Sequence, residues 1–161
     1  MAVPDEALLL DHQICFALYN ASRAVTRAYG PLLEPLGLTY PQYLTMLVLW
    51  EEKSSTVKAL GQRLALDSGT LTPLLKRLEE RGLVTRRRDT DDERVVRIEL
   101  TAEGKKLRAR ARQVPLGLAC RIGFDIEKKE SLARLVKLRE ELTALTERIE
   151  AGAGAELAAG G

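Results

Sequence analysis

The sequence predicts a mainly α-helical fold that carries one small β-hairpin. Apolar residues recur at steps of three and four over most of the 161 residues, which is the periodicity of helices with one buried face. The period shortens to two only within residues 84–100, where β-branched residues alternate with charged ones. Hydrophobic residues make up 45% of the chain, too many for a disordered protein, so we expect a packed core.

The first half of the chain is expected to hold four helices, bounded by residues that start or stop helices. The first covers residues 8–29 and stops at Gly30-Pro31, because proline lacks the N–H that a helix interior needs. A short turn over 32–36 precedes a second helix, which Thr39 caps and which ends at 53–55. The remaining two are expected at 57–66 and 70–81, joined by the turn formers Asp67-Ser68-Gly69.

A β-hairpin is expected directly after the fourth helix. Residues 84–88 and 95–100 are short and rich in β-branched side chains, and the turn formers Asp89-Thr90-Asp91-Asp92 lie between them. Two helices joined by a tight turn and followed by a hairpin form a winged helix-turn-helix. The sequence therefore predicts a winged helix-turn-helix lobe over residues 37–100.

The last third of the chain is expected to be helical and then disordered. Thr101 opens a helix that Pro115 and Gly117 should kink or interrupt, because proline does not fit a helix interior. A final helix runs from about 125 to 150 with a long apolar face. The tail 151–161 is almost all Ala and Gly, and we expect it to be disordered.

Positive charge is concentrated in the middle of the chain. The net charge is only +2, but residues 56–112 carry fifteen Lys and Arg against nine Asp and Glu, a local net charge of +6. That placement suits a polyanion as the partner of the middle third. The flanking parts, 1–36 and 101–150, have more apolar face than a small lobe can cover, so we expect them to form a helical dimerisation region in a homodimer.

Composition excludes several other classes of protein. No apolar run approaches the roughly 20 residues of a membrane helix, and the acidic first residues resemble no secretory signal, so we expect a soluble, cytoplasmic protein with no membrane partner. His12 is the single histidine and Cys15 and Cys120 are the only cysteines, too few for a Cys₄ or Cys₂His₂ zinc site. Nothing recognisable as a Ser-His-Asp triad surrounds His12. We expect no metal, no cofactor and no enzymatic activity.

The middle third resembles the MarR family of bacterial transcriptional regulators. The resemblance rests on residues 60–81, on Arg81-Gly82-Leu83-Val84, and on Asp92-x-Arg94 followed by Ile98-x-Leu100-Thr101, and it extends over roughly 8–150. It implies a homodimer that binds palindromic double-stranded operator DNA, with one helix in the major groove and the hairpin on the minor groove or phosphates. The residues expected to contact DNA are Ser68, Thr70, Thr72, Lys76 and Arg77 on the helix, and Arg86, Arg87, Arg88, Asp92, Arg94 and Arg97 on the hairpin.

Some of these residues have simpler interpretations, which the sequence leaves open. Lys76 and Arg77 are also typical of a solvated helix face. By the resemblance, Arg94 is the arginine at the wing tip and Asp92 the carboxylate that orients it, although an ordinary surface ion pair has the same residues. Pro73 leaves the start of this helix undecided, because it forfeits a backbone hydrogen bond unless it lies in the first turn.

Cys15 and two tyrosines resemble the organic hydroperoxide resistance regulator (OhrR) branch of the same family. The matching segments are 11–19, Tyr29 before Gly30-Pro31, and Tyr40 within 38–43. In that branch the matching cysteine senses peroxide, and two tyrosines reach it from the other subunit. The chemistry agrees, because a thiolate is the nucleophile and phenol hydroxyls donate hydrogen bonds to it without adding a charge. The resemblance implies an organic hydroperoxide as the inducer.

Cys120 resembles the second cysteine of a two-cysteine subtype, in which the sulfenic acid on the sensing cysteine condenses with it. We therefore expect a disulfide between Cys15 of one subunit and Cys120 of the other. The alternative for both cysteines is a buried, inert thiol. Tyr19 is a further candidate to stabilise the Cys15 thiolate, and its alternative role is that of a packing aromatic. His12 is expected at a helix surface or interface. No arginine is close in sequence to Cys15 to polarise a peroxide.

The leading hypothesis is a dimeric repressor that leaves DNA when Cys15 is oxidised. Two alternatives stay open: a MarR-type repressor that responds to a small aromatic ligand, and a thiol peroxidase. The basic middle third and the hairpin argue against a peroxidase, which needs neither. The sequence does not indicate the operator, the regulated genes or the preferred hydroperoxide.

Overall fold

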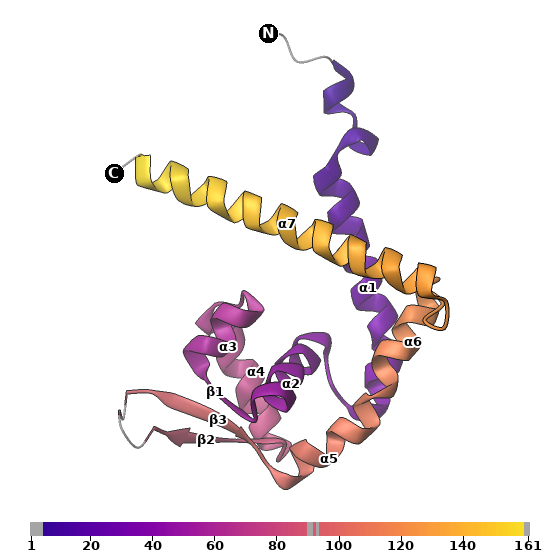
Figure 1. Cartoon of the computed structure of the whole chain (residues 1–161). Coiled ribbons are helices and arrows are strands. Elements are labelled where there is room, and N and C mark those ends of the chain that lie inside the picture. The colour runs from indigo at the N-terminus through magenta and orange to yellow at the C-terminus, as the bar shows by residue number, and fades with distance from the viewer. Residues whose placement is uncertain (1–4, 90–91, 93, 160–161) are drawn as a thin grey trace. The chain divides into compact units, whose positions relative to one another are not determined.

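The computed structural model describes the backbone of residues 5–89, 92 and 94–159 (Figure 1). The chain forms two compact units, Met1–Leu118 and Ala119–Gly161. The described elements are the 3-10 turns Asp5–Leu8, Leu10–His12 and Glu34–Leu36, the helices α1 (Ile14–Leu33), α2 (Tyr40–Glu52), α3 (Val57–Leu64), α4 (Ser68–Glu80), α5 (Ala102–Ala111), α6 (Gln113–Arg121) and α7 (Lys129–Ala159), and the strands β1 (Ser54–Thr56), β2 (Val84–Arg88) and β3 (Val96–Leu100). The predicted class, mainly α with a small β-wing, is confirmed.

The sheet has three strands, one more than the sequence predicted. All pairs are antiparallel and the order is β1-β3-β2. The additional strand, β1, pairs Ser55 with Ile98 and buries both side chains. Residues 53–55 were expected only to end the preceding helix, because Ser54-Ser55-Thr56 is too short and too polar to show a strand period. Pairing with β3, a contact distant in sequence, makes it a strand.

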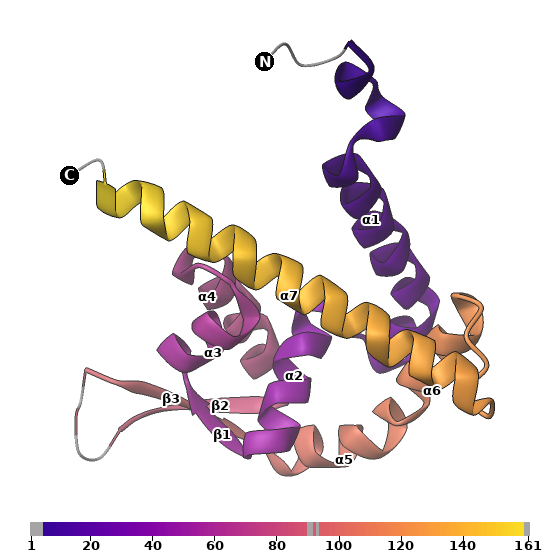
Figure 2. The same cartoon turned by 45° about the horizontal axis from the view of Figure 1, so that its top comes forward.

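The core of the first unit lies where α2, α3 and α4 pack against the sheet (Figure 2). Met46 and Leu49 of α2, Leu60 of α3 and Leu75 of α4 are completely buried there. Ile98 closes the sheet side of the same core. The lobe is therefore a single packed body on which α4 and the β2–β3 hairpin are held in fixed relation to each other.

The first long helix differs from the prediction at both ends. The structure starts α1 at Ile14, because two separate 3-10 turns come before it, and each turn is followed by an extended residue, Leu9 and Gln13. At the other end α1 continues through Gly30 and Pro31. Burial of Leu33 in the core and the hydrogen bond from Glu34 N–H to Gly30 O offset the hydrogen bond that Pro31 cannot make. Cys15 therefore lies in the first turn of α1 and not in the middle of a helix.

Three further boundaries resolve or correct the sequence predictions. α4 starts at Ser68, so Pro73 lies in the helix interior and its missing N–H leaves one turn without a hydrogen bond. The break between α5 and α6 falls at Arg112, and Pro115 lies inside the first turn of α6, where it is tolerated. α7 continues to Ala159, whereas the last helix was expected to end near residue 150, before the tail; 160–161 lie outside the described residues.

Candidate nucleic-acid interface and thiol site

The turn between α3 and α4 fixes the angle at which α4 leaves the lobe. Ala65 ends α3 in the left-handed conformation, with φ of 51°, and Leu66 N–H donates to Gly61 O. A Cβ at Gly61 would lie 2.9 Å from Leu66 O, so only glycine lets the chain turn back this closely. The two helices therefore form the tight pair that the sequence predicted.

Asp67 caps the N-terminus of α4. Its carboxylate accepts hydrogen bonds from the backbone N–H of Thr70 (2.8 Å) and from the Thr70 hydroxyl (3.0 Å). These two hydrogen bonds, the backbone one first, hold the pKa of Asp67 below its ordinary value of 3.8. The cap locks the first turn of α4 and leaves the Thr70 oxygen facing solvent as an acceptor.

The outer face of α4 is polar and exposed. Its inner side buries Leu71, Leu74, Leu75 and Leu78, so the opposite side faces away from the lobe. All five predicted contact residues of the helix are on that exposed face: Ser68, Thr70, Thr72, Lys76 and Arg77. Lys76 lies 3.8 Å from Glu80, an exposed ion pair that contributes little to stability. The face offers hydroxyls and two cations over about two helical turns, the size of one major-groove contact.

Arg86 differs from the other arginines of the hairpin, because it faces α4. Its guanidinium donates to Thr72 O (3.0 Å) and lies 3.3 Å from a Glu79 carboxylate oxygen, and its backbone N–H donates to Glu79 (3.1 Å). Arg86 is half-buried there. It therefore braces the wing against α4 and leaves little of its charge for DNA.

Arg97 is also held inside the hairpin. Its guanidinium donates twice to Asp89, at 2.9 and 2.6 Å, and Asp89 is largely buried. The register places Arg87 directly opposite Arg97, where two like charges repel. Pairing of Arg97 with Asp89 relieves that repulsion and leaves Arg87 and Arg88 exposed.

The wing tip carries Arg94 and Asp92, both exposed. The Asp92 carboxylate accepts a hydrogen bond from the backbone N–H of Arg94 (3.0 Å), so it fixes the turn from which Arg94 projects. Residues 90, 91 and 93 of the predicted turn lie outside the described residues. The predicted pair is thus brought together, with Asp92 acting on the backbone of Arg94.

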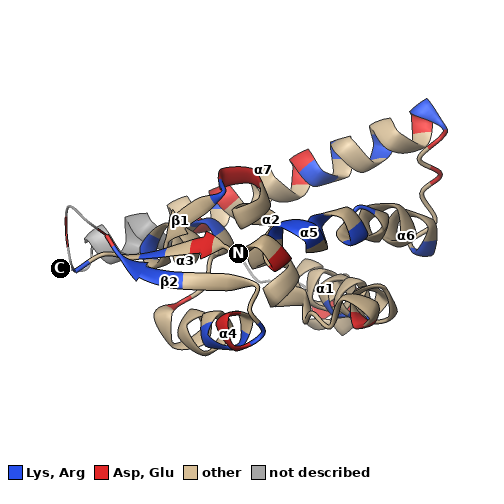
Figure 3. Cartoon of the chain, turned by 90° about the horizontal axis from the view of Figure 1, so that it is seen from below, with Lys and Arg blue, Asp and Glu red and all other residues tan. Residues whose placement is uncertain are grey.

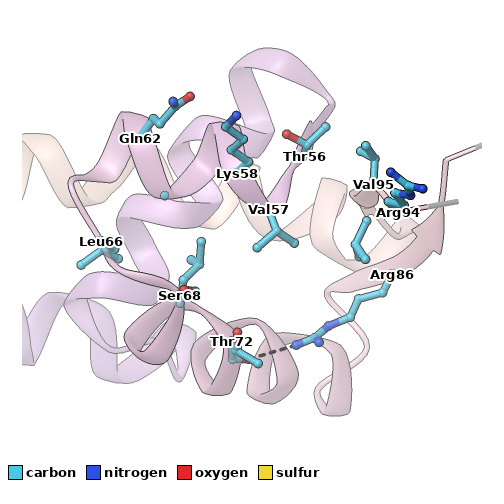
Figure 4. A pocket seen from close by; sticks show the side chains of 13 residues that line it. Thr56, Val57, Lys58, Gln62, Leu66, Ser68, Thr72, Arg86, Arg94 and Val95 are labelled. Atoms are coloured by element: carbon cyan, nitrogen blue, oxygen red, sulfur yellow. Dashed lines mark hydrogen bonds between the residues drawn. The ribbon is translucent and has the colours of Figure 1, made fainter. Parts of the chain in front are cut away.

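A groove of about 810 Å³ separates the helix pair from the wing. Figure 4 shows Val57 and Lys58 on one side, Ser68 and Thr72 below, and Arg86, Arg94 and Val95 on the wing side. Figure 3 shows positive charge at the outer end of β2 and along α5. The exposed face of α4 and the exposed wing arginines belong to one rigid lobe, and together they present a cationic surface with a polar helix at its centre.

The thiol of Cys15 lies in the first turn of α1 and is exposed on this chain, outside the core of its own subunit. Tyr29 is on the same helix, fourteen residues further on. At a rise of 1.5 Å per residue the two are about 21 Å apart along the axis. Tyr29 therefore cannot reach Cys15 of its own chain, and only a second copy can bring the two together.

Tyr29 and Tyr40 lie together in a cluster that also contains Tyr43. The rings of Tyr29 and Tyr40 stack with centroids 4.5 Å apart, and Tyr43 lies 5.7 Å from Tyr29. Burial, and then the neighbouring Tyr40 and Tyr43, raise the pKa of Tyr29 to about 12. Burial also raises the pKa of Tyr40. Both phenols stay protonated at physiological pH and can donate hydrogen bonds to an anion such as a thiolate.

Tyr19 is exposed one turn after Cys15, and its hydroxyl oxygen accepts a hydrogen bond from Arg23 (2.8 Å). Arg23 was not predicted as a neighbour of this site, because it lies eight positions after Cys15 in the sequence. The spacing by four residues, Cys15 to Tyr19 to Arg23, would have placed all three on one face of a helix. His12 is exposed in the turn before α1, as expected for a surface position.

Cys120 lies near the end of α6 and is exposed on this chain. The chain turns directly after it: Gly123 N–H donates to Cys120 O, and Gly123 has a φ of 78°, which favours glycine. Over the residues that the structure describes, no cluster of His, Cys, Asp or Glu suits a metal ion. None of the described helices has the length and apolar character of a membrane span.

A helix pair with a capped, exposed second helix and a cationic wing is the DNA-binding element of winged-helix transcriptional regulators. The family of transcriptional regulators SarA/Rot matches residues 27–110. An organic hydroperoxide resistance transcriptional regulator of Bacillus subtilis (strain 168) is 50% identical over 125 residues, 76% of this chain and 85% of the relative. The chain therefore belongs to the MarR family of transcriptional regulators, in its organic hydroperoxide resistance branch.

Solved structures agree with this assignment. Reduced AbfR of Staphylococcus epidermidis, bound to DNA, matches with a TM-score of 0.68 at 35% identity, over 88% of this chain and 98% of that one. Disulfide-formed AbfR matches with 0.61 at 37%, over 89% and 96%. A MarR-family regulator from Rhodococcus sp. RHA1 matches with 0.73 at 26%, over 85% and 94%. These proteins are transcriptional regulators rather than enzymes.

Proposed function

We propose that this protein is a peroxide-sensing repressor, which binds palindromic operator DNA as a homodimer and is released when an organic hydroperoxide oxidises Cys15. The observation that carries the proposal is the exposed thiol of Cys15 on α1, in a chain half identical to an organic hydroperoxide resistance regulator. AbfR is known in a reduced form bound to DNA and in a disulfide form, which supports a regulator of this fold whose cysteines can form a disulfide.

DNA is contacted by the exposed face of α4 and by three wing arginines, Arg87, Arg88 and Arg94. Arg86 and Arg97 contribute by holding the wing in place. Replacing Arg94 with Gln weakens operator binding and lowers the slope of log affinity against log salt by about one, because one phosphate contact and its counterion are lost. Lys137→Gln, on α7 outside the lobe, is the matched control and leaves the slope unchanged. Equal slopes for Arg94→Gln and wild type would exclude Arg94 from the interface.

The homodimer is held by helices outside the lobe. Leu8, Leu10 and Ile14 at the start of the chain are each more than half exposed, and α7 separately exposes Leu132 and Ile149. Apolar faces of this kind are typical of an interface between subunits. A chain truncated after residue 121 is expected to be insoluble, or to be a monomer that does not bind the operator. Sedimentation measures its oligomeric state. A soluble truncated dimer with full DNA affinity would contradict this interface.

Oxidation proceeds from Cys15 to an intersubunit disulfide with Cys120. The sulfenic acid formed on Cys15 is attacked by the Cys120 thiolate of the other subunit; the S–S bond forms, the S–O bond breaks, and the hydroxide that leaves takes up a proton from solvent to become water. On a non-reducing gel, hydroperoxide-treated protein is expected to run as a covalent dimer, and Cys15→Ser or Cys120→Ser abolishes the band. Only Cys15→Ser also abolishes trapping of sulfenic acid. Protein that leaves DNA yet runs entirely as a monomer would exclude the cross-link.

The groove between the helix pair and the wing supports a second candidate, a repressor that responds to a small aromatic ligand. The groove has the size of a small-molecule site, and Arg86 and Arg94 line it. Such a repressor responds to its ligand without Cys15. If Cys15→Ser leaves the response of DNA binding to inducer intact, this second candidate replaces the first.

A further inference from the structure

A second groove of about 350 Å³, the α2–α5 groove, lies between these two helices. Leu47 and Trp50 of α2, with Ala111 and Pro115 opposite them, give it an apolar floor. Leu47 is 40% exposed, although most of the large apolar side chains of α2 are buried. The groove therefore presents apolar surface that an occupant would shield from water.

Two arginines give the rim of this groove a positive charge. Arg108 and Arg112 are exposed and lie one helical turn apart. Within the part of the chain that the structure describes, neither guanidinium takes part in an ion pair. The carboxylate at the rim, Glu51, is already paired with Arg63 (2.5 Å). An occupant with apolar side chains and carboxylates would fit both the floor and the rim.

The N-terminal segment, residues 5–12, has this composition. It forms two 3-10 turns, and the Gln13 side chain folds them against the start of α1 by donating to Leu9 O (3.3 Å) and to Ala7 O. Its leucines are each more than half exposed: Leu8, Leu9 and Leu10. Its carboxylates are also exposed: Asp5, Glu6 and Asp11. The segment is thus a preformed apolar and acidic element that its own chain leaves uncovered.

The segment cannot reach the groove of its own chain. Tyr43 lines the groove, and its ring lies 5.7 Å from that of Tyr29. Ile14, where the segment joins α1, is fifteen residues before Tyr29, about 22 Å along the helix axis. Eight residues in 3-10 turns span only about 16 Å. Figure 1 accordingly shows the N-terminal turns at the end of α1 that points away from α2.

A second copy of the chain brings segment and groove together. We propose that the N-terminal segment of one subunit docks in the α2–α5 groove of the other, with its leucines on the apolar floor and Asp11 paired with Arg112. The inference rests on the homodimer of the proposed function, whose two-fold symmetry makes two such contacts. Cys15 follows Asp11 by four residues, so docking carries the sensing thiol toward the tyrosine cluster at the Tyr43 end of the groove.

The direction of the groove selects Arg112 as the partner of Asp11. Trp50 Nε1 donates to a carbonyl in the first turn of α5, so Trp50 and Arg108 mark one end of the groove. From there α2 leads back to Tyr43 and α5 leads on to Arg112, and these two residues mark the other end. Asp11 is the acid of the segment nearest to the sensing thiol in the sequence, so it meets the tyrosine end.

A cross-link tests the docking without any use of the sensing thiol. In a Cys15→Ser, Cys120→Ser background, Leu10→Cys and Leu47→Cys place one thiol on the segment and one on the groove floor. Treated with diamide, this protein is expected to run as a covalent dimer on a non-reducing gel, because a disulfide needs Cα atoms within about 7 Å. The matched control pairs Leu10→Cys with Gln62→Cys, which is exposed on α3 outside this groove. We expect at least about tenfold less covalent dimer from the control.

A charge swap tests the ion pair. Asp11→Arg brings two cations together and Arg112→Asp two carboxylates, so each is expected to speed subunit exchange about tenfold. The double variant restores opposite charges and should exchange within about threefold of the parent rate. Lys105→Asp, on the exposed side of α5 but outside the groove, is the control and leaves the rate within about twofold. Mass spectrometry of mixed isotope-labelled and unlabelled protein measures the rate.

The outcomes are distinguishable. If sedimentation shows the parent protein to be a monomer, the homodimer of the proposed function is wrong. If it is a dimer but Leu10→Cys with Leu47→Cys links no better than the control, or links within one chain, the function stands and this inference is overturned. The groove would then be open to another occupant, such as a small organic anion. Exchange that stays fast in the double variant would overturn the pairing of Asp11 with Arg112.

Discussion

Tyr29 shows at the residue scale why the proposed sensor needs two subunits. Its phenol is kept protonated by burial and by the stacked Tyr40, so it is suited to donate a hydrogen bond to a thiolate. Yet it lies about 21 Å along the same helix from Cys15 of its own chain. In the proposed dimer, each sensing thiol is therefore completed by tyrosines that belong to the other chain.

Mixed dimers test this arrangement directly. Chains with Tyr29→Phe and Tyr40→Phe are expected to oxidise at Cys15 at least about tenfold more slowly with hydroperoxide, since the thiolate loses two donors. When these chains are mixed with Cys15→Ser chains, the intact tyrosines of the second chain meet the intact Cys15 of the first. Oxidation should return to the parent rate in that mixed dimer. Mass spectrometry confirms that the subunits have exchanged. If oxidation stays slow in the mixed dimer, the tyrosines act on the thiol of their own chain.

Asp67 connects a single carboxylate to the stability of α4. Hydrogen bonds from Thr70 lower the pKa of Asp67 in the folded state below its ordinary value of 3.8. The charged carboxylate therefore stabilises the folded protein at pH values above 3.8. That contribution is lost as pH falls through the lower, folded pKa. We expect Asp67→Asn, which can still cap the helix, to be less stable than wild type near neutral pH and to converge with it in acid. Denaturant unfolding at several pH values measures this; a difference that does not shrink in acid would contradict it.

At the scale of elements, α5 is fixed to the lobe by one close approach. A Cβ at Gly104 would lie 2.1 Å from Leu83 O, and Trp50 Nε1 donates to Gly104 O (2.8 Å). Thr101 closes the same contact, because its hydroxyl donates to Gly82 O and its N–H to Leu83 O. The start of α5 therefore rests directly on the backbone that leads into the wing.

Gly104→Ala is expected to destabilise the protein by about 1–3 kcal/mol, because backbone and not a flexible side chain meets the added methyl group. Gly152→Ala in α7 is the matched control. Nothing lies within 4 Å of a Cβ built there, and alanine favours a helix over glycine by up to about 1 kcal/mol. Chemical denaturation should show opposite signs for the two substitutions. If Gly104→Ala left the free energy of unfolding unchanged, the contact with the Leu83 backbone would have to relax without a cost in free energy.

The sequence predicted those elements whose signals are local. Helix periodicity, Thr101 as a cap, and the charged turn of the hairpin predicted α3, α5 and the wing. It failed where distant contacts decide: β1 is a strand because β3 pairs with it, and α1 passes Pro31 because Leu33 is buried. The inward positions of Arg86 and Arg97 depend on Glu79 and Asp89, which no sequence period reveals. In the sequence, Arg86 and Arg97 have the same charge as the exposed wing arginines and lie in the same two strand segments.

Across the whole molecule, hydrogen bonds join the turn after α1 to the end of α4, the helix that carries the candidate DNA contacts. Arg81, directly after α4, donates to Leu36 O (3.0 Å) and also to Gly37 O. Arg110 of α5 donates to Pro35 O. The segment between the tyrosines Tyr29 and Tyr40 is thus bonded to the helix that presents the candidate DNA contacts. The two segments are therefore expected to move together, as parts of one packed lobe.

In the proposed repressor, oxidation of Cys15 controls DNA binding. The decisive measurement is the operator affinity of wild type and of Cys15→Ser, at fixed salt, before and after treatment with an organic hydroperoxide. We expect wild type to lose at least about tenfold in affinity, roughly 1.4 kcal/mol, and to regain it with a thiol reductant. Cys15→Ser should bind equally before and after treatment. Release of Cys15→Ser to the same extent as wild type, or full retention of DNA by oxidised wild type, would show that Cys15 does not control DNA binding.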